Sequence, residues 1–425
     1  MKVLQNILAA GLLFTAAAQA LEPRTWVLVD GRVVEATLES VQGNLIKLLG
    51  NDGKQLQFDR ALVSIGDNEY IKENFPDAKP AMMGMGTTGT AQLPMPGKLA
   101  KIDQKTFKLA AGTLKTQDIT WDVMETPHFK VMYQKPVDPR DCGELAERMW
   151  IDAAYVHATF PNKFINGQRM AIFLAPTDTQ YEHLGSWYVE MLKKAGDNDN
   201  ATRVGASWPK SAAGTMQLSQ DIARDNSLLP EAQVFRAYRK GNTGRDELLK
   251  GVWQPFWTHC LSSDMIDIQA GGVSSFGAKG YYALVTGHAY FKEVSYTGRS
   301  ETGLLRTQSA AGNDVSTVAA LADANKWPSE LKKLVRKGEV KATMEAVFGL
   351  ARENADPKGN VLAYAWARYL QSSLPRLACF NKLIQRISTS NQIPEPDDLA
   401  RLYGFDSASA MEADFAKYLA SPEFH

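Results

Sequence analysis

The chain has 425 residues, and its 47 lysines and arginines balance 47 aspartates and glutamates, so the formal net charge is zero. With 44% hydrophobic and 22% charged residues it is not a wholly disordered chain, because such chains combine low hydrophobicity with high net charge. The zero net charge also argues against a protein that binds nucleic acid by bulk attraction to phosphates. At about 150 residues per domain, the length predicts two or three domains.

Residues 1–20 have the pattern of an export signal. Lys2 supplies a positive charge, residues 7–18 are apolar, and Ala18-Gln19-Ala20 matches a small-residue cleavage pattern. The apolar stretch is shorter than the ~20 residues that a membrane-spanning helix needs. We therefore expect cleavage after Ala20 and a periplasmic or extracellular protein without a membrane span. The alternative is a buried N-terminal helix.

Residues 24–72 combine short β-rich runs with turn dipeptides. The runs cover 26–29, 33–38, 45–49 and 55–58, and the turns between them are Asp30-Gly31, Gly43-Asn44 and Asn51-Asp52-Gly53. Turns at this regular spacing predict β-hairpins in a small antiparallel barrel.

The same segment resembles the Sla homology domain one family, which is a small SH3-like barrel. The resemblance rests on Arg24-x-Trp26, the turn residues, Leu62-x-Ser64, Asp67 and Tyr70, whereas Asp59 departs from the family's usual proline. It implies that residues 21–75 form an SH3-like barrel that binds a peptide or protein. The alternative is a barrel that only packs against the next domain.

A stretch rich in proline, glycine and methionine follows. Residues 76–97 hold four glycines, a Met-rich run and the prolines Pro76, Pro80, Pro94 and Pro96. A stretch with so many residues that break helices and strands cannot form a packed core. We therefore assign 76–120 as a linker and connector.

Residues 121–425 alternate between strand and helix patterns. Residues 129–133 and 170–174 are typical of strands, and the segment 144–160 has an apolar helical face. Later helical patterns cover 362–370, 377–387 and 411–419. Strands followed by a helical half predict an α+β, mainly helical domain.

This order, starting at Thr126-Pro127-His128-Phe129, resembles gluzincin-type, thermolysin-like zinc peptidases. Those enzymes place two zinc-binding histidines and a general base on one helix as His-Glu-x-x-His, and a Glu ligand on a following helix. The resemblance implies a gluzincin-like domain, but the chain contains no His-Glu-x-x-His.

The segment in the expected place surrounds His259. If His259 is the second ligand, Pro255 and Phe256 replace the first ligand and the general base. If His259 is the first ligand, Cys260 and Ser263 replace the base and the second ligand. Lys279 stands where the third ligand belongs. We therefore predict no catalytic, metal or cofactor site, and a vestigial cleft formed by Pro255, Phe256, Trp257, His259 and Lys279. The alternative is that the chain has no peptidase ancestry and that His259 is an ordinary, partly buried histidine.

Three functions are consistent with these features. The first is an exported, non-catalytic binding or scaffold protein of the bacterial cell envelope, with a peptide- or protein-binding barrel and a pseudo-peptidase domain. The second is a peptidase-like hydrolase with an unconventional site, built from some of His259, Asp264, His288 and Glu293. The third is a purely structural envelope protein. We expect a peptide, protein or envelope component as partner, and no nucleic acid. The three cysteines, Cys142, Cys260 and Cys379, exclude a disulfide scaffold and allow one disulfide.

Overall fold

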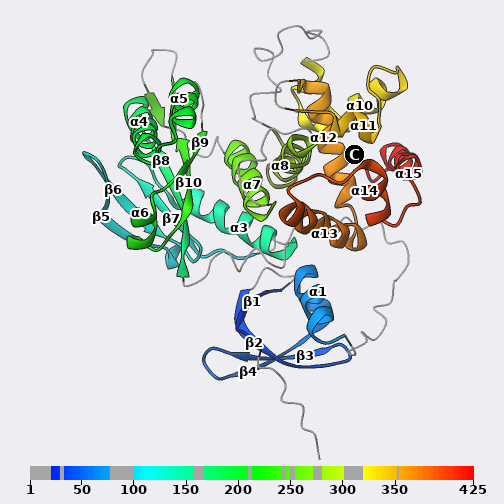
Figure 1. The fold of residues 1–425 in the computed structure, drawn as a ribbon, viewed down its shortest axis with the longest axis horizontal. Helices are drawn as coiled ribbons and strands as arrows, with labels where there is room; N and C mark the ends of the chain where they lie inside the picture. The colour runs from blue at the N-terminus through cyan, green and yellow to red at the C-terminus, as the bar shows by residue number, and fades with distance from the viewer. Residues whose placement is uncertain are drawn as a thin grey trace, which may run out of the picture.

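The computed structural model describes residues 21–28, 33–76, 100–156, 167–208, 213–240, 246–248, 254–270, 280–300, 319–351 and 354–425 (Figure 1). The predicted export signal, most of the predicted linker and Lys279 lie outside these residues.

The N-terminal part is a four-stranded antiparallel sheet in the order β1-β2-β3-β4. Its strands coincide closely with the predicted runs: β1 (Arg24–Val27), β2 (Val33–Gln42), β3 (Leu45–Gly50) and β4 (Gln55–Asp59). A β-bridge from Leu28 to Val63 joins the end of β1 to the segment after β4, and helix α1 (Ile65–Asn74) follows. The alternating inward side chains form a separate core of Trp26, Leu28, Ala36, Leu38, Ile46, Leu48, Val63 and Ile71.

Asp67 connects this sheet to α1. Its carboxylate accepts hydrogen bonds from Arg24 Nη2 at 2.8 Å, from the Val27 N–H at 2.9 Å and from Ser64 Oγ at 2.8 Å. Ser64 Oγ also caps α1 by accepting from the Asp67 N–H at 3.0 Å. The Arg24 guanidinium lies 4.0 Å from the centre of the Tyr70 ring. The polar residues noted in the sequence motif therefore form one contact network.

One side of the N-terminal sheet packs against the rest of the chain. Helix α1 contacts α3 (Arg140–Val156) and α13 (Leu374–Ser390), and β1 also contacts α3. Val27 belongs to the large core of the following region. Figure 1 shows β3 and β4 on the side turned away from α3 and α13.

The larger region contains a six-stranded mixed sheet in the order β5-β6-β7-β8-β10-β9. Strand β8 runs parallel to both β7 and β10, and the other neighbours are antiparallel. The strands are β5 (Lys108–Thr116), β6 (Ile119–Glu125), β7 (Phe129–Tyr133), β8 (Arg169–Ala175), β9 (Ala213–Gln217) and β10 (Leu228–Arg236). A separate two-stranded ribbon is formed by β11 (Tyr238–Lys240) and β12 (Asp246–Leu248).

Helices cover both faces of the six-stranded sheet. Helix α3 connects β7 to β8 and packs in the larger core, on the face that includes Val131 and Ile172. The opposite face forms a second core with α4 (Asp178–Lys194), α5 (Asn198–Ser207) and α6 (Gln220–Asp225). Strand residues alternate between the two cores, as the period of two in a β-strand requires.

Two expectations are corrected by this sheet. Strand β5 lies inside 76–120, which we expected to be a linker and connector. It is an edge strand with a bulge between Ala110 and Leu114. Because of this bulge, polar and apolar residues do not alternate clearly along its glycine-containing sequence. Along the chain, helices α3 to α6 also alternate with strands of this one sheet. The region is therefore mixed α/β, and not a set of strands followed by a set of helices. The predicted helical C-terminal half is confirmed.

From Gln254 onward, the regular elements among the described residues are all helical. They are α7 (Gln254–Ala270), α8 (Tyr281–Thr297), α10 (Trp327–Arg336), α11 (Met344–Phe348), α12 (Pro357–Leu370), α13, α14 (Pro396–Leu402) and α15 (Ala408–Ala420). Helix α8 is central and contacts α7 and α12. A Cβ added at Gly287 would lie 2.4 Å from Ala363 O, so glycine allows the close approach of α12. Within the described residues, the helices lack the combination of length and apolarity that crossing a bilayer requires.

Candidate functional site

Four of the five predicted vestigial residues lie on helix α7, and Lys279 is outside the described residues. Pro255 and Trp257 are buried, and the Trp257 ring lies 6.1 Å from that of Phe235 on β10. Phe256 is half-buried and packs against the large core. These side chains therefore contribute to packing between α7 and its surroundings.

His259 is paired with Glu293 of α8. His259 Nδ1 lies 3.0 Å from Glu293 Oε2, and this hydrogen bond links α7 to α8. The Tyr290 ring meets the His259 imidazole edge-on, with 4.6 Å between ring centres. Of the four residues considered for an unconventional hydrolase site, the structure brings these two together. Sequence reasoning did not pair them, because they are 34 residues apart and lie on different helices.

The neighbouring residue on α8 makes a second buried pair. Lys292 Nζ lies 2.5 Å from Asp152 Oδ2 on α3. Glu293 is 0% exposed and Lys292 is 2% exposed, so both charged groups rely on protein partners instead of water. Helix α8 is thereby joined to α7 through Glu293 and to α3 through Lys292.

His288 of α8 contacts Gln371, which follows α12, and Phe380 on α13. Its Nδ1 is 3.2 Å from Gln371 Nε2, and its ring stacks on Phe380 with 5.6 Å between centres. The aromatic side chains Tyr281, Tyr282, Tyr290 and Phe291 of α8 are all buried.

An acidic group with a perturbed pKa lies at the other end of α7. Asp267 Oδ1 accepts a hydrogen bond from Tyr281 OH at 2.6 Å. Burial raises the pKa of Asp267 to about 6, against the lowering effect of that hydrogen bond. Burial, with the charges of Glu231 and Asp267, also raises the pKa of Asp264 well above its ordinary value. Both carboxyls therefore favour the protonated form more than exposed aspartates do.

The Thr126–Phe129 motif is held by Glu147 of α3. The Glu147 carboxylate accepts from Thr126 Oγ1 at 2.6 Å and from the His128 N–H at 2.8 Å, and His128 Nδ1 is 2.8 Å from it. The His128 ring stacks on Trp150 at 3.5 Å. This arrangement attaches the start of β7 to α3, so the motif has a structural explanation.

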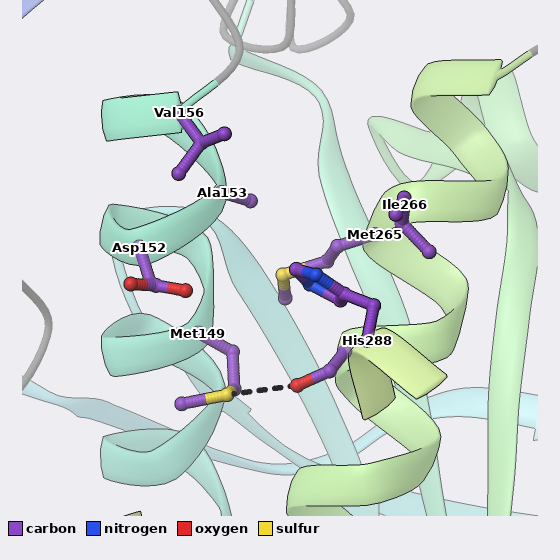
Figure 2. A pocket seen from close by; sticks show the side chains of 8 residues that line it. Met149, Asp152, Ala153, Val156, Met265, Ile266 and His288 are labelled. Atoms are coloured by element: carbon purple, nitrogen blue, oxygen red, sulfur yellow. Dashed lines mark hydrogen bonds between the residues drawn. The ribbon is translucent and has the colours of Figure 1, made fainter. Parts of the chain in front are cut away.

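Two cavities flank α8. The one between α3, α7 and α8 measures about 10 Å³, enough for one water molecule, and its lining includes Asp152, Ser262 and His288 (Figure 2). The other measures about 270 Å³ and is lined by Val294, Ser295, Ala324, Asn325, Pro328, Tyr364, Arg368 and His425. None of the four predicted cleft residues on α7 lines either cavity.

The described part of the chain contains no group of three or more His, Cys, Asp or Glu side chains arranged to hold a metal ion. All three cysteines are free thiols. Burial, with the charges of Asp264 and Glu293, raises the pKa of Cys260 well above its ordinary value, which disfavours the nucleophilic thiolate.

Comparisons with models of known protein families, with curated proteins and with solved structures found no match.

The raised pKa of Asp267 predicts a specific dependence of stability on pH. A carboxyl whose pKa is higher in the folded state stabilises the fold at low pH, and this contribution is lost as the pH rises through about 6. We expect the free energy of unfolding of the wild-type chain to fall by up to about 3 kcal/mol between pH 4 and 7 because of this group, and Asp267→Asn to abolish that fall. Chemical denaturation at several pH values measures this. Tyr281→Phe should move the loss to higher pH because it removes the hydrogen bond to the carboxylate. An Asp267→Asn protein with the wild-type pH profile would contradict the assignment.

Proposed function

We propose that this chain is an exported, non-catalytic binding or scaffold protein of the cell envelope. In this proposal, the N-terminal sheet is an SH3-like Sla homology barrel that binds a peptide or protein. The helical region is a gluzincin-type peptidase domain that has lost its metal site. The observation that carries the proposal is the direct hydrogen bond between His259 on α7 and Glu293 on α8.

The contact between α7 and α8 supports the pseudo-peptidase assignment. In a gluzincin-type enzyme, a histidine on one helix and a glutamate on a later helix approach each other because both bind one zinc ion. Here His259 and Glu293 approach each other and form a hydrogen bond. Ser263 follows His259 by four residues, which places it on the same helical face where a second histidine would stand. On this alignment the third-ligand position is Glu293 rather than Lys279, and Cys260 replaces the general base.

The same contacts weigh against the hydrolase alternative. A hydrolase that uses His259 as a base needs a nucleophile or an activated water within hydrogen-bond reach. Among the described residues, the hydrogen bond that His259 forms goes to Glu293, and no serine, threonine or cysteine is bonded to its imidazole. His288 is bonded to Gln371 instead. The cavity between α3, α7 and α8 is too small for a substrate.

The packing of the N-terminal sheet indicates which of its sides is available to a ligand. Helix α1 and β1 contact α3 and α13, whereas β3 and β4 face away from them (Figure 1). Two leucines are exposed on segments next to β3 and β4: Leu45 begins β3 and is 38% exposed, and Leu62 follows β4 and is 43% exposed. The hydrogen bond from the Arg60 N–H to Asn44 O holds these segments together. We place the peptide-binding surface around these leucines.

Rebuilding the metal site tests the pseudo-peptidase assignment. We expect Ser263→His to bind Zn²⁺ at least about 100-fold more tightly than the wild-type chain, since it adds a histidine four residues after His259. Adding Glu293→Gln should abolish the gain. Adding Cys260→Glu to Ser263→His restores the position of the general base and is the variant in which peptide hydrolysis is tested.

Titration with Zn²⁺, with folding checked by circular dichroism, measures the affinities. Asp264→His, one position further around the helix, is the matched control and should gain nothing. Equal zinc affinity in both histidine variants would contradict the alignment. Stoichiometric zinc in the wild-type chain would contradict the non-catalytic proposal.

Peptide selection tests the binding surface. A library of random dodecamer peptides is panned against the mature chain, and selected peptides are measured by fluorescence anisotropy. We expect at least about tenfold weaker binding to the Leu45→Glu/Leu62→Glu variant, because it places charge in an apolar contact. Leu109→Glu is the control, since Leu109 is 51% exposed on edge strand β5. Unchanged binding to the double variant would place the ligand elsewhere.

A further inference from the structure

The small cavity between α3, α7 and α8 combines an apolar wall with polar side chains. Its apolar lining consists of Met149, Ala153, Val156, Met265 and Ile266, and Asp152, Ser262 and His288 supply polar atoms. Figure 2 shows the His288 ring in the space between α3 and α7, and Asp152 on α3. At about 10 Å³, the cavity has room for a single water molecule.

Asp152, one of the residues that line this cavity, has a carboxylate oxygen without a hydrogen-bond partner. The residue is 3% exposed, and Lys292 is bonded to its Oδ2 at 2.5 Å. Its Oδ1 is buried and has no hydrogen-bond partner. A buried carboxylate oxygen without a hydrogen bond is costly, and in proteins such atoms are commonly satisfied by internal water.

The other polar side chains suit a water molecule as the occupant. Ser262 Oγ donates to Met149 Sδ at 3.2 Å, which leaves the lone pairs of the hydroxyl as acceptors. The His288 ring is held in place by Gln371 and Phe380, so its position at the cavity is defined. A metal cation is a poor occupant, because the Lys292 ammonium is already bonded to the same carboxylate.

We propose that this cavity is an internal hydration site, in which one water molecule donates a hydrogen bond to Asp152 Oδ1. The water completes the hydrogen bonding of the buried Asp152–Lys292 pair and joins α3 to the wall formed by α7 and α8. This inference does not depend on the proposed binding function, because it concerns the interior of the helical region.

A high-resolution crystal structure of the full chain tests the site directly. We expect one density peak in the cavity within hydrogen-bond distance of Asp152 Oδ1, about 2.5–3.2 Å. A cavity without density, in a structure that resolves other internal waters, would overturn the proposal.

Magnetic relaxation dispersion of water nuclei tests the site in solution, because it counts water molecules with long residence times. The Asp152→Leu/Lys292→Met variant removes both charges together and should show one long-lived water fewer than the wild-type chain. Replacing the exposed pair Asp221 and Arg224 on α6 in the same way should leave the count unchanged. An equal count in the wild-type chain and the Asp152→Leu/Lys292→Met variant would overturn the proposal, and the crystallographic test still applies if that variant does not fold.

Discussion

Two adjacent charged residues on a buried helix constrain the whole helical region. Lys292 and Glu293 are buried residues of α8. Each needs a partner in the protein, because an uncompensated buried charge costs several kcal/mol. Neighbouring residues on a helix point about 100° apart, so one partner cannot serve both side chains. Lys292 is paired with Asp152 on α3 and Glu293 with His259 on α7. These two pairs hold the three helices in one register and define how α3 and α7 flank α8.

The same pairs connect the fold to its proposed function. In the proposed pseudo-peptidase assignment, His259 and Glu293 occupy the positions of metal-binding groups, and here they are bonded to each other and link α7 to α8. Helix α3, which carries Asp152, also contacts the N-terminal part of the chain, because α1 and β1 pack against it. The N-terminal sheet is therefore connected to the helical region by packing contacts as well as by the polypeptide chain. A ligand bound on the β3–β4 side would be presented at a defined position relative to the helices.

Local patterns in the sequence predicted much of the fold. Alternating side chains and turn dipeptides located β1 to β4, and helical periodicity located α3, α12, α13 and α15, because these signals depend on neighbours along the chain. The parallel pairing of β7, β8 and β10 was not predicted, since each short apolar run is compatible with several pairings. Edge strand β5 was not predicted, because polar and apolar residues do not alternate clearly along its sequence. Glu293 was missed as the partner of His259, because such a contact depends on how two helices cross and the family motif directed attention to Lys279.

The most direct measurement of the central interaction is a double-mutant cycle on His259 and Glu293. Free energies of opening for α8 are obtained from amide hydrogen exchange in the wild-type chain, His259→Ala, Glu293→Ala and the double variant. A direct hydrogen bond to a charged group predicts a coupling energy of about 1.5–3 kcal/mol. Additive effects of the two substitutions, with a coupling near zero, would contradict the account in which this bond takes the place of a metal ion.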